Sequence, residues 1–358
     1  MATVVLAGGG TAGHIEPALA VARHWMITHP KDRCIFLGTK SGLENNLVPS
    51  AGFELRIIPK VGISRKPSTS WLRTPFDLIA AVIASLKIVK RADVLIGFGG
   101  YVSAPAYLAA FLARTPIVIH EANAKPGWAN RLGARFTTAL AVAHPVDKGR
   151  FSEALLAGLP LRSDVAQACI ASAADWSKAR RLAKARLGFP TDKPLVFIMG
   201  GSQGSVAING VISSSISTFT TKEISVLHSV GKLNTLPAAI DGYRPVGYVD
   251  AMADAYLAAD LIIARSGAVT CSEFRAVGRY ALFVPLPIGN GEQFVNAALL
   301  VSAGRAEILS QRDFTPQFID AQISALLERA SRAPIQGDAQ DLHAAEKILA
   351  LAEFAMKS

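Results

Sequence analysis

The sequence lacks the signatures of several large protein classes. It has only three cysteines, Cys34, Cys169 and Cys271, at spacings that fit neither a disulfide framework nor a zinc site. Such thiols are typical of a reduced cytoplasmic compartment. No run approaches the roughly 20 apolar residues that a membrane-spanning helix requires, since the best candidate, 78–89, is interrupted by Ser85 and Lys87. We therefore expect no structural metal site and no transmembrane helix, and also no secretion signal, because the chain enters an apolar strand at once.

Two phosphate-related motifs are also missing. There is no Gly-Lys-Ser or Gly-Lys-Thr sequence, which argues against a P-loop nucleotide hydrolase. There is no Asp-x-Asp pair, which glycosyltransferases that hold a divalent metal on a sugar-nucleotide diphosphate commonly carry. If this chain binds a diphosphate, backbone N–H groups, helix ends and side-chain donors must neutralise it.

Acidic residues are scarce in the first part of the chain. Residues 1–160 contain 18 lysines and arginines against 9 acidic residues, whereas the remainder contains 19 against 18. The excess indicates an anionic lipid surface, an acidic acceptor or nucleic acid as partner, or only a solvated basic surface. We expect no nucleic acid, because no recognition module and no basic strip interleaved with aromatics is present.

Two glycine-rich segments are the most informative feature that is present. Gly8-Gly9-Gly10-Thr11-Ala12-Gly13-His14 follows the apolar run 3–7, and Gly200-Gly201-Ser202-Gln203-Gly204 follows the apolar run 195–199. Each is typical of a strand, a tight turn and the start of a helix. This arrangement directs N–H groups and the positive end of a helix at an anion such as a diphosphate.

Short apolar runs alternate with helical stretches in both halves, which predicts an α/β fold with parallel sheets. We predict two Rossmann-like domains facing an interdomain cleft: residues 1–160, residues 161–338, and a C-terminal helix, 339–358, that packs back toward the first domain. The predicted strands are 3–7, 33–38, 54–58, 93–97, 116–120 and 138–143 in the first half, and 195–199, 224–228, 246–249, 260–264 and 281–284 in the second.

Gly8-x-Gly10-x-x-Gly13 formally matches the dinucleotide-binding fingerprint. That fingerprint also requires an acidic residue at the end of the second strand to bind the ribose. The second strand here ends in Gly38-Thr39-Lys40-Ser41, without a carboxylate. The pattern therefore argues against a nicotinamide or flavin enzyme, and we expect no cofactor.

The second half offers groups suited to a sugar nucleotide. Ala268 to Thr270 follow a predicted strand and would begin a helix, and Glu273, one turn later, can accept hydrogen bonds from a ribose diol. Gln293 and Asn296 carry amides suited to sugar hydroxyls. A favourable charge in a helix's first turn, and ordinary capping, are the alternative interpretations of these residues.

Five motifs in order resemble a known family: the N-terminal Gly-Gly-Thr-x-Gly-His segment, Gly99-Gly100-Tyr101-Val102-Ser103, His120-Glu121-x-Asn123, Gly200 to Gly204, and Arg265 to Glu273. Together they resemble the MurG family of bacterial UDP-N-acetylglucosamine transferases, which convert lipid I to lipid II. The resemblance implies the GT-B fold, with the acceptor on the N-terminal domain and the UDP-sugar on the C-terminal domain. It also implies inverting, metal-independent transfer of GlcNAc to the 4-hydroxyl of a lipid-linked N-acetylmuramyl-pentapeptide.

The resemblance further implies the roles of individual residues. Glu273 should hold the ribose, the Val249 backbone should meet uracil, and Gln293 should contact GlcNAc. The remaining donor-binding residues are Thr11, Ala12, Gly13, Asn123, Arg162, Ser202, Ala268, Val269 and Thr270, and the acceptor diphosphate is expected at Gly99, Gly100 and Tyr101. Ala12, Leu159 and Glu292 depart from the family's usual residues.

His14 is the candidate general base, because a helix N-terminus disfavours the imidazolium and keeps the ring able to accept a proton. Glu121 is the alternative base, and a His that only caps the loop is the third interpretation. The helix that begins near Pro75 either is a buried crossover or lies at a bilayer, which would place the enzyme peripherally on the cytoplasmic face of the plasma membrane. A diacylglycerol glycosyltransferase and a UDP-GlcNAc epimerase remain as rival enzymes.

Overall fold

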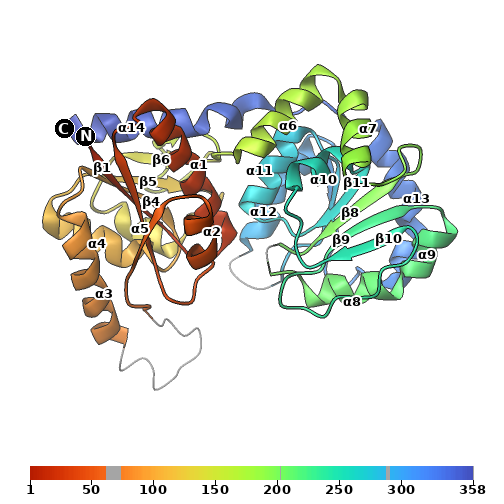
Figure 1. The fold of residues 1–358 in the computed structure, drawn as a ribbon, viewed down its shortest axis with the longest axis horizontal. Helices are drawn as coiled ribbons and strands as arrows, with labels where there is room; N and C mark the ends of the chain where they lie inside the picture. The colour runs from red at the N-terminus through yellow and green to blue at the C-terminus, as the bar shows by residue number, and fades with distance from the viewer. Residues whose placement is uncertain (62–73, 202, 288–290, 358) are drawn as a thin grey trace. The chain divides into compact units, whose positions relative to one another are not determined.

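The computed structural model describes residues 1–61, 74–201, 203–287 and 291–357. The chain forms two compact units: Met1–Arg162 with Gln340–Ser358, and Ser163–Ala339. Each unit is built on its own parallel sheet, of seven and six strands respectively (Figure 1). The predicted α/β class with two parallel sheets is therefore confirmed.

The first sheet has the strand order β3-β2-β1-β4-β5-β6-β7. Its strands are β1 (Thr3–Gly8), β2 (Arg33–Gly38), β3 (Glu54–Ile57), β4 (Val94–Gly99), β5 (Ile117–Glu121), β6 (Leu140–Val142) and β7 (Leu155–Leu156). Its helices are α1 (Ala12–Thr28), α2 (Glu44–Ser50), α3 (Thr74–Val89), α4 (Ser103–Ala113), α5 (Trp128–Gly133), the 3₁₀ helix η2 (Ala339–His343) and α14 (Ala344–Lys357).

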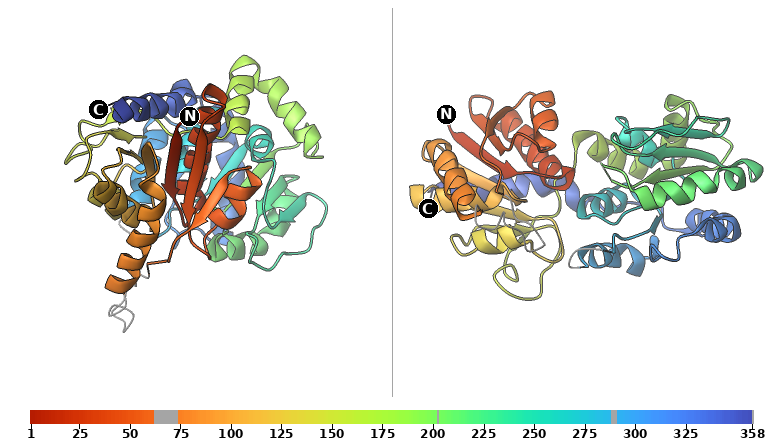
Figure 2. Two further views of the ribbon diagram at one scale, coloured as in Figure 1. Left: turned by 60° about the vertical axis from the view of Figure 1, so that its left-hand side comes forward. Right: turned by 90° about the horizontal axis from the view of Figure 1, so that it is seen from below.

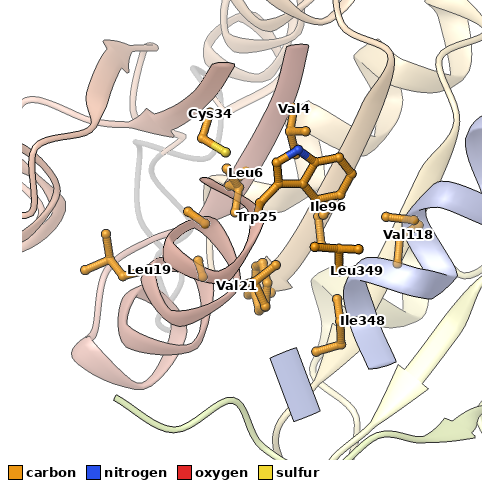
Figure 3. Packing of buried hydrophobic residues seen from close by; sticks show 14 of the residues in the cluster. Val4, Leu6, Leu19, Val21, Trp25, Cys34, Ile96, Val118, Ile348 and Leu349 are labelled. Carbon is orange, nitrogen blue, oxygen red and sulfur yellow. The ribbon is translucent and has the colours of Figure 1, made fainter. Parts of the chain in front are cut away.

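Helices cover both faces of this sheet, and alternation along β1 shows why. Val4 and Leu6 point to one core and Val5 and Ala7 to the other. In the first core, Trp25 of α1 and Ile348 and Leu349 of α14 pack with Val4, Leu6, Ile96 and Val118 of the sheet (Figure 3). The C-terminal helix thus completes the core of the first unit, although about 180 residues of the second unit separate it in sequence from β7.

The second sheet has the order β10-β9-β8-β11-β12-β13, and its strands all pair in parallel (Figure 2). Its strands are β8 (Leu195–Met199), β9 (Ser225–Ser229), β10 (Tyr243–Val246), β11 (Leu261–Ala264), β12 (Ala281–Phe283) and β13 (Ala306–Ile308). Its helices are α6 (Ser163–Ala174), α7 (Trp176–Arg186), α8 (Val206–Ser214), α9 (Ile216–Thr221), α10 (Met252–Ala258), α11 (Ala268–Val277), α12 (Glu292–Ser302) and α13 (Pro316–Arg332).

One strand prediction was wrong, and two strands were missed. The strand expected at 246–249 is β10, Tyr243–Val246, three residues earlier, and the short edge strands β7 and β13 were not expected at all. All three lie at or next to a sheet edge, where one neighbouring strand suffices and short polar-apolar mixtures can pair. The strands flanking the glycine-rich turns are central and apolar, and there the predictions agree with the structure to within two residues.

Helix α3 has one buried face and one exposed face that carries large apolar side chains. Ala81 and Ser85 are buried, whereas Phe76, Ile79 and Ile83 are 72%, 57% and 51% exposed. Among the helices that the structure describes, none is long and apolar enough to cross a membrane.

A buried histidine in the second unit couples its stability to pH. His228 of β9 is fully buried; its Nδ1 lies 2.9 Å from the Tyr243 hydroxyl and its Nε2 lies 3.1 Å from Oδ1 of Asn209. Burial lowers the pKa of His228 to about 4. The folded unit therefore holds this ring neutral over a range in which an unfolded chain takes up a proton.

We predict that this difference lowers the free energy of unfolding as the pH falls below 6.5, by up to about 3 kcal/mol at pH 4. The sign follows because the unfolded state binds the proton first. Urea unfolding of the wild type and of His228→Gln, at neutral pH and at about pH 5, measures it. The variant should lose stability less steeply on acidification, and equal slopes would contradict the assignment to His228.

Candidate active site

The loops that follow β1, β4 and β5 lie at the carboxyl edge of the first sheet, where three neighbouring strands end. Ligands of doubly wound sheets bind at this edge. After β1 the chain turns through Gly10, whose φ of +92° is readily adopted only by glycine, and enters α1 at Ala12. Thr11 is exposed, and Ala12 and Gly13 are partly exposed in the first turn.

His14 lies in the first turn of α1, with Nδ1 3.2 Å from the carbonyl oxygen of Gly9 and 3.2 Å from Oγ1 of Thr11. A carbonyl can only accept, so this contact assigns the proton to Nδ1 and leaves a lone pair on Nε2. Burial lowers the pKa of His14, against the opposing effects of the Glu121 carboxylate and the Gly9 carbonyl. The ring is therefore neutral at physiological pH and able to accept a proton at Nε2.

The turn after β4 packs directly on His14 and on the first glycine-rich loop. A Cβ on Gly100 would lie 2.3 Å from the Gly9 carbonyl oxygen, and one on Gly99 would lie 3.3 Å from the His14 ring. Both glycines have positive φ, +93° and +81° for Gly99 and Gly100 respectively. Only glycine allows this close approach, so the residue pair fixes the place of the ring. Tyr101, the next residue, is half-buried.

Glu121, at the end of β5, is 2% exposed and accepts four hydrogen bonds. Oε1 accepts from the backbone N–H and side-chain amide of Asn123, at 2.9 and 3.1 Å. Oε2 accepts from the Gly127 N–H and from Nδ2 of Asn130, both at 2.9 Å. This carboxylate closes the loop 122–127 on itself, which leaves His14 as the more accessible base.

In the first glycine-rich loop, one N–H group has a different partner from the one predicted. Its Gly10 N–H, which should face an external anion, donates instead to Oε2 of Glu44 at 3.1 Å. This acceptor belongs to the first residue of α2, and the spacing of the sequence did not indicate it. Glu44 is fully buried.

In the second unit, Arg265 joins the loops after three strands. Its guanidinium donates to the carbonyls of Val284 and Pro285, at 2.8 and 3.0 Å, and to Oγ of Ser205 at 2.8 Å. Ser205 caps α8 at the end of the second glycine-rich loop. Arg265 therefore sets the spacing between that loop and the turn that leads to α12. Ser202, expected at the diphosphate, lies outside the described residues.

Helix α11 begins at Ala268, directly after β11, so that the first-turn residues Ala268, Val269 and Thr270 direct N–H groups beyond the carboxyl edge. Glu273, 3% exposed, accepts a 2.6 Å hydrogen bond from the hydroxyl of Tyr256, a partner that the sequence did not indicate. This bond restrains the rotamer of the Glu273 side chain.

Two further donor-site candidates lie in this unit. Gln293 of α12 accepts the Leu286 N–H at 2.9 Å, and Val249 is buried in the segment between β10 and α10. Asn296 is buried and donates to the Ser266 carbonyl at 3.4 Å, so its amide has a structural contact.

The structure thus gathers His14, Gly99, Gly100 and Glu121 at one edge of the first unit. Arg162 is the last residue of the first unit before the chain enters the second unit at Ser163, and it does not follow any of these three strands directly. Residues that sequence reasoning missed are Glu44, Asn130 and Tyr256, each a partner of a predicted residue through contacts between distant segments.

Comparisons with known proteins agree with this architecture. Residues 4–142 match the profile of the glycosyltransferase family 28 N-terminal domain, and residues 195–351 match that of its C-terminal domain. The chain belongs to glycosyltransferase family 28. It is therefore a glycosyltransferase. The first profile covers β1 to β6 except for the first residue of β1, and the second covers β8 to β13 and extends into α14.

Named relatives are similar over most of the chain. A protein of Paenarthrobacter aurescens is 43% identical over 338 residues, covering 92% of this chain and 89% of its own length; one of Corynebacterium glutamicum strain R is 46% identical over 327 residues, covering 90% and 89%. Both are named UDP-N-acetylglucosamine–N-acetylmuramyl-(pentapeptide) pyrophosphoryl-undecaprenol N-acetylglucosamine transferase.

Among solved structures, Acinetobacter baumannii MurG is similar at a TM-score of 0.70 and 27% identity, covering 98% of this chain and all of that one. A putative UDP-N-acetylglucosamine 2-epimerase of Listeria monocytogenes is similar at a TM-score of 0.65 but only 12% identity, over 98% and 95% of the two chains. The second likeness concerns the fold alone.

We predict that Glu121→Ala lowers the free energy of unfolding by about 3 kcal/mol or more, because it leaves buried donors without an acceptor. His14→Ala, which removes a half-buried ring from the same edge, should cost clearly less. Chemical denaturation of the two variants beside the wild type measures both. A Glu121→Ala variant as stable as the wild type would show that the carboxylate does not hold the loop.

Proposed function

We propose that this enzyme transfers GlcNAc from UDP-GlcNAc to the 4-hydroxyl of N-acetylmuramyl-pentapeptide in undecaprenyl-diphosphate-linked lipid I, forming lipid II for peptidoglycan synthesis. The observation that carries the proposal is the 43–46% identity, over nine-tenths of the chain, to transferases whose names state this reaction. The likeness to an epimerase, the rival enzyme, is only 12% identical and concerns the fold alone.

The geometry of His14 supports an inverting mechanism. Nε2 would take the proton of the acceptor 4-hydroxyl while that oxygen attacks the anomeric carbon and the bond to UDP breaks. The electron pair leaves with the diphosphate, whose charge the N–H groups at the start of α11 would stabilise. Glu121 is the weaker candidate for the base, because four donors already occupy its oxygens.

The second unit is the proposed donor site. Glu273, with its rotamer held by Tyr256, would accept hydrogen bonds from the ribose diol, and the Val249 backbone would meet uracil. Ala268, Val269, Thr270 and the second glycine-rich loop with Ser202 would hold the diphosphate, and Gln293 the sugar. These are dipoles and neutral donors, which supports transfer without a divalent metal.

The first unit is the proposed acceptor site. The turn Gly99-Gly100-Tyr101 would receive the acceptor diphosphate. The remaining donor contacts, from Thr11, Ala12, Gly13, Asn123 and Arg162, are proposed on the family resemblance.

A lipid-linked acceptor requires contact with a membrane, and the exposed face of α3 supports one. Phe76, Ile79 and Ile83 project from α3, and Phe111 and Leu112 of the neighbouring α4 are 55% and 64% exposed. Exposed basic residues lie at the ends of both helices: Lys87 in the last turn of α3, Lys90 and Arg91 directly after it, and Arg114 after α4. The sequence has three further basic residues just before α3, Arg65, Lys66 and Arg73, which we also expect at the membrane and which lie outside the described residues. We infer peripheral binding to an anionic bilayer, on the cytoplasmic face of the plasma membrane.

We predict that His14→Ala lowers kcat by about 10²–10⁴-fold, the usual contribution of a positioned base, while UDP binding persists. Turnover of a lipid I analogue and isothermal titration with UDP measure the two effects, with a chelator present throughout. Because the pKa of His14 is lowered, wild-type kcat should hold as the pH falls to 6.5 and decline only below it. Unchanged turnover in the variant would show that His14 is not the base. Loss of wild-type turnover in the presence of the chelator would contradict metal-independent transfer.

We predict that Phe76→Ser combined with Ile79→Ser weakens binding to vesicles containing anionic lipid at least about tenfold, because both side chains would leave the interface. Co-sedimentation at increasing salt measures the binding. Phe354→Ser is the matched control, since Phe354 of α14 is 69% exposed in the same unit. Equal binding by the double variant and the wild type, or binding that ignores salt, would contradict a membrane role for α3.

A further inference from the structure

Glu44 is a buried carboxylate to which the proposed reaction gives no role. It is the first residue of α2 and has no exposed surface. Within the described part of the chain it forms no ion pair, so its partners are hydrogen-bond donors. Burying a carboxylate in this way is costly unless donors surround it, which makes each of its contacts informative.

These contacts come from the loops after three adjacent strands. Oε1 accepts from the Thr39 N–H at 3.0 Å, after β2, and from the Tyr101 hydroxyl at 3.0 Å, after β4. Oε2 accepts from the Gly10 N–H at 3.1 Å, after β1. Glu44 thereby joins the edge of the sheet that carries His14.

The carboxylate fits because glycines surround it. A Cβ on Gly42 would lie 2.0 Å from Oε2, and one on Gly38 would lie 2.5 Å from Cγ of Glu44. Side chains at either position would displace the carboxylate from the loops. The cradle therefore accommodates this acidic side chain and leaves no room for an external anion at the Gly10 N–H.

One peptide group connects Glu44 to His14. The Gly10 N–H and the Gly9 carbonyl belong to the same peptide, which is trans, so that they point in opposite directions. Glu44 takes the N–H end at 3.1 Å, and Nδ1 of His14 lies 3.2 Å from the carbonyl end. The order is carboxylate, peptide, imidazole.

We propose that Glu44 is a positioning residue: it holds the Gly9–Gly10 peptide with its carbonyl toward His14 and so keeps the proton of that ring on Nδ1. The proposal rests on the role proposed above for His14 as the base. Nε2 then carries the lone pair that a base needs.

Such a hold is necessary because the peptide lies between two glycines, whose backbone torsion angles have little intrinsic preference of their own. A rotated peptide would turn the Gly10 N–H toward Nδ1. Nδ1 could then only accept, the proton would move to Nε2, and the ring could no longer take a proton from the acceptor hydroxyl there.

The test reads the tautomer directly from ¹⁵N chemical shifts of protein labelled in histidine, with the His14 signals assigned by their loss in His14→Ala. The wild type should carry the proton on Nδ1. In Glu44→Ala a population with the proton on Nε2 should appear, kcat should fall about 10-fold to 100-fold, as for loss of an orienting partner, and KM for UDP-GlcNAc should not change. Glu44→Gln should partly restore both readouts, because its amide oxygen can still accept from Gly10.

Asp341→Ala is the matched control. Asp341 is also a buried carboxylate of the first unit, and it accepts the Leu159 N–H at 3.0 Å away from His14. It should lose stability without changing the tautomer. A wild-type ring protonated on Nε2 overturns the proposal even if no Glu44 variant folds, and so does a Glu44→Ala protein with the wild-type tautomer. If the tautomers are as predicted but His14→Ala is fully active, His14 is not the base, whereas the effect of Glu44 on its tautomer still holds.

Discussion

The close approach of backbone to backbone at the carboxyl edge of the first sheet is the constraint on which the proposed chemistry depends. A side chain on Gly100 would clash with the carbonyl oxygen of Gly9, so the two loops can pack this closely only with glycine there. The His14 ring packs against both loops. The ring is neutral because it is buried there, and its proton is assigned because a carbonyl faces Nδ1. The geometry of the proposed base thus depends on this glycine packing, and its electrostatics depend on burial and on the Gly9 carbonyl.

Buried carboxylates organise this edge in different ways. Glu121 binds N–H donors and Glu44 binds N–H and hydroxyl donors, and neither pairs with a cation in the described part of the chain. Each closes a loop after a strand. Glu273 in the second unit accepts a hydrogen bond from the hydroxyl of Tyr256. A carboxylate that follows a parallel strand is therefore not by itself a sign of catalysis. The number of hydrogen-bond donors that its own chain supplies determines whether its oxygens can act on a substrate.

The two glycine-rich loops look alike in sequence but are used differently. In the first, the Gly10 N–H is satisfied internally by Glu44. In the second, Arg265 ties the end of the loop to the turn after β12 through Ser205 and two carbonyls. Distant residues thus bind the two loops in different ways, although both loops connect a strand to a helix.

The sequence by itself determined the α/β class and the two parallel sheets, because apolar periodicity and glycine turns are local signals. It also predicted that His14 and Glu273 follow strands, and the structure places them after β1 and β11. It could not show Glu44, Asn130 or Tyr256 as their partners, nor the short strands β7 and β13, since these depend on segments that meet only when the sheets form. The tertiary structure alone decided which donors each carboxylate meets, and therefore which nitrogen of His14 carries the proton.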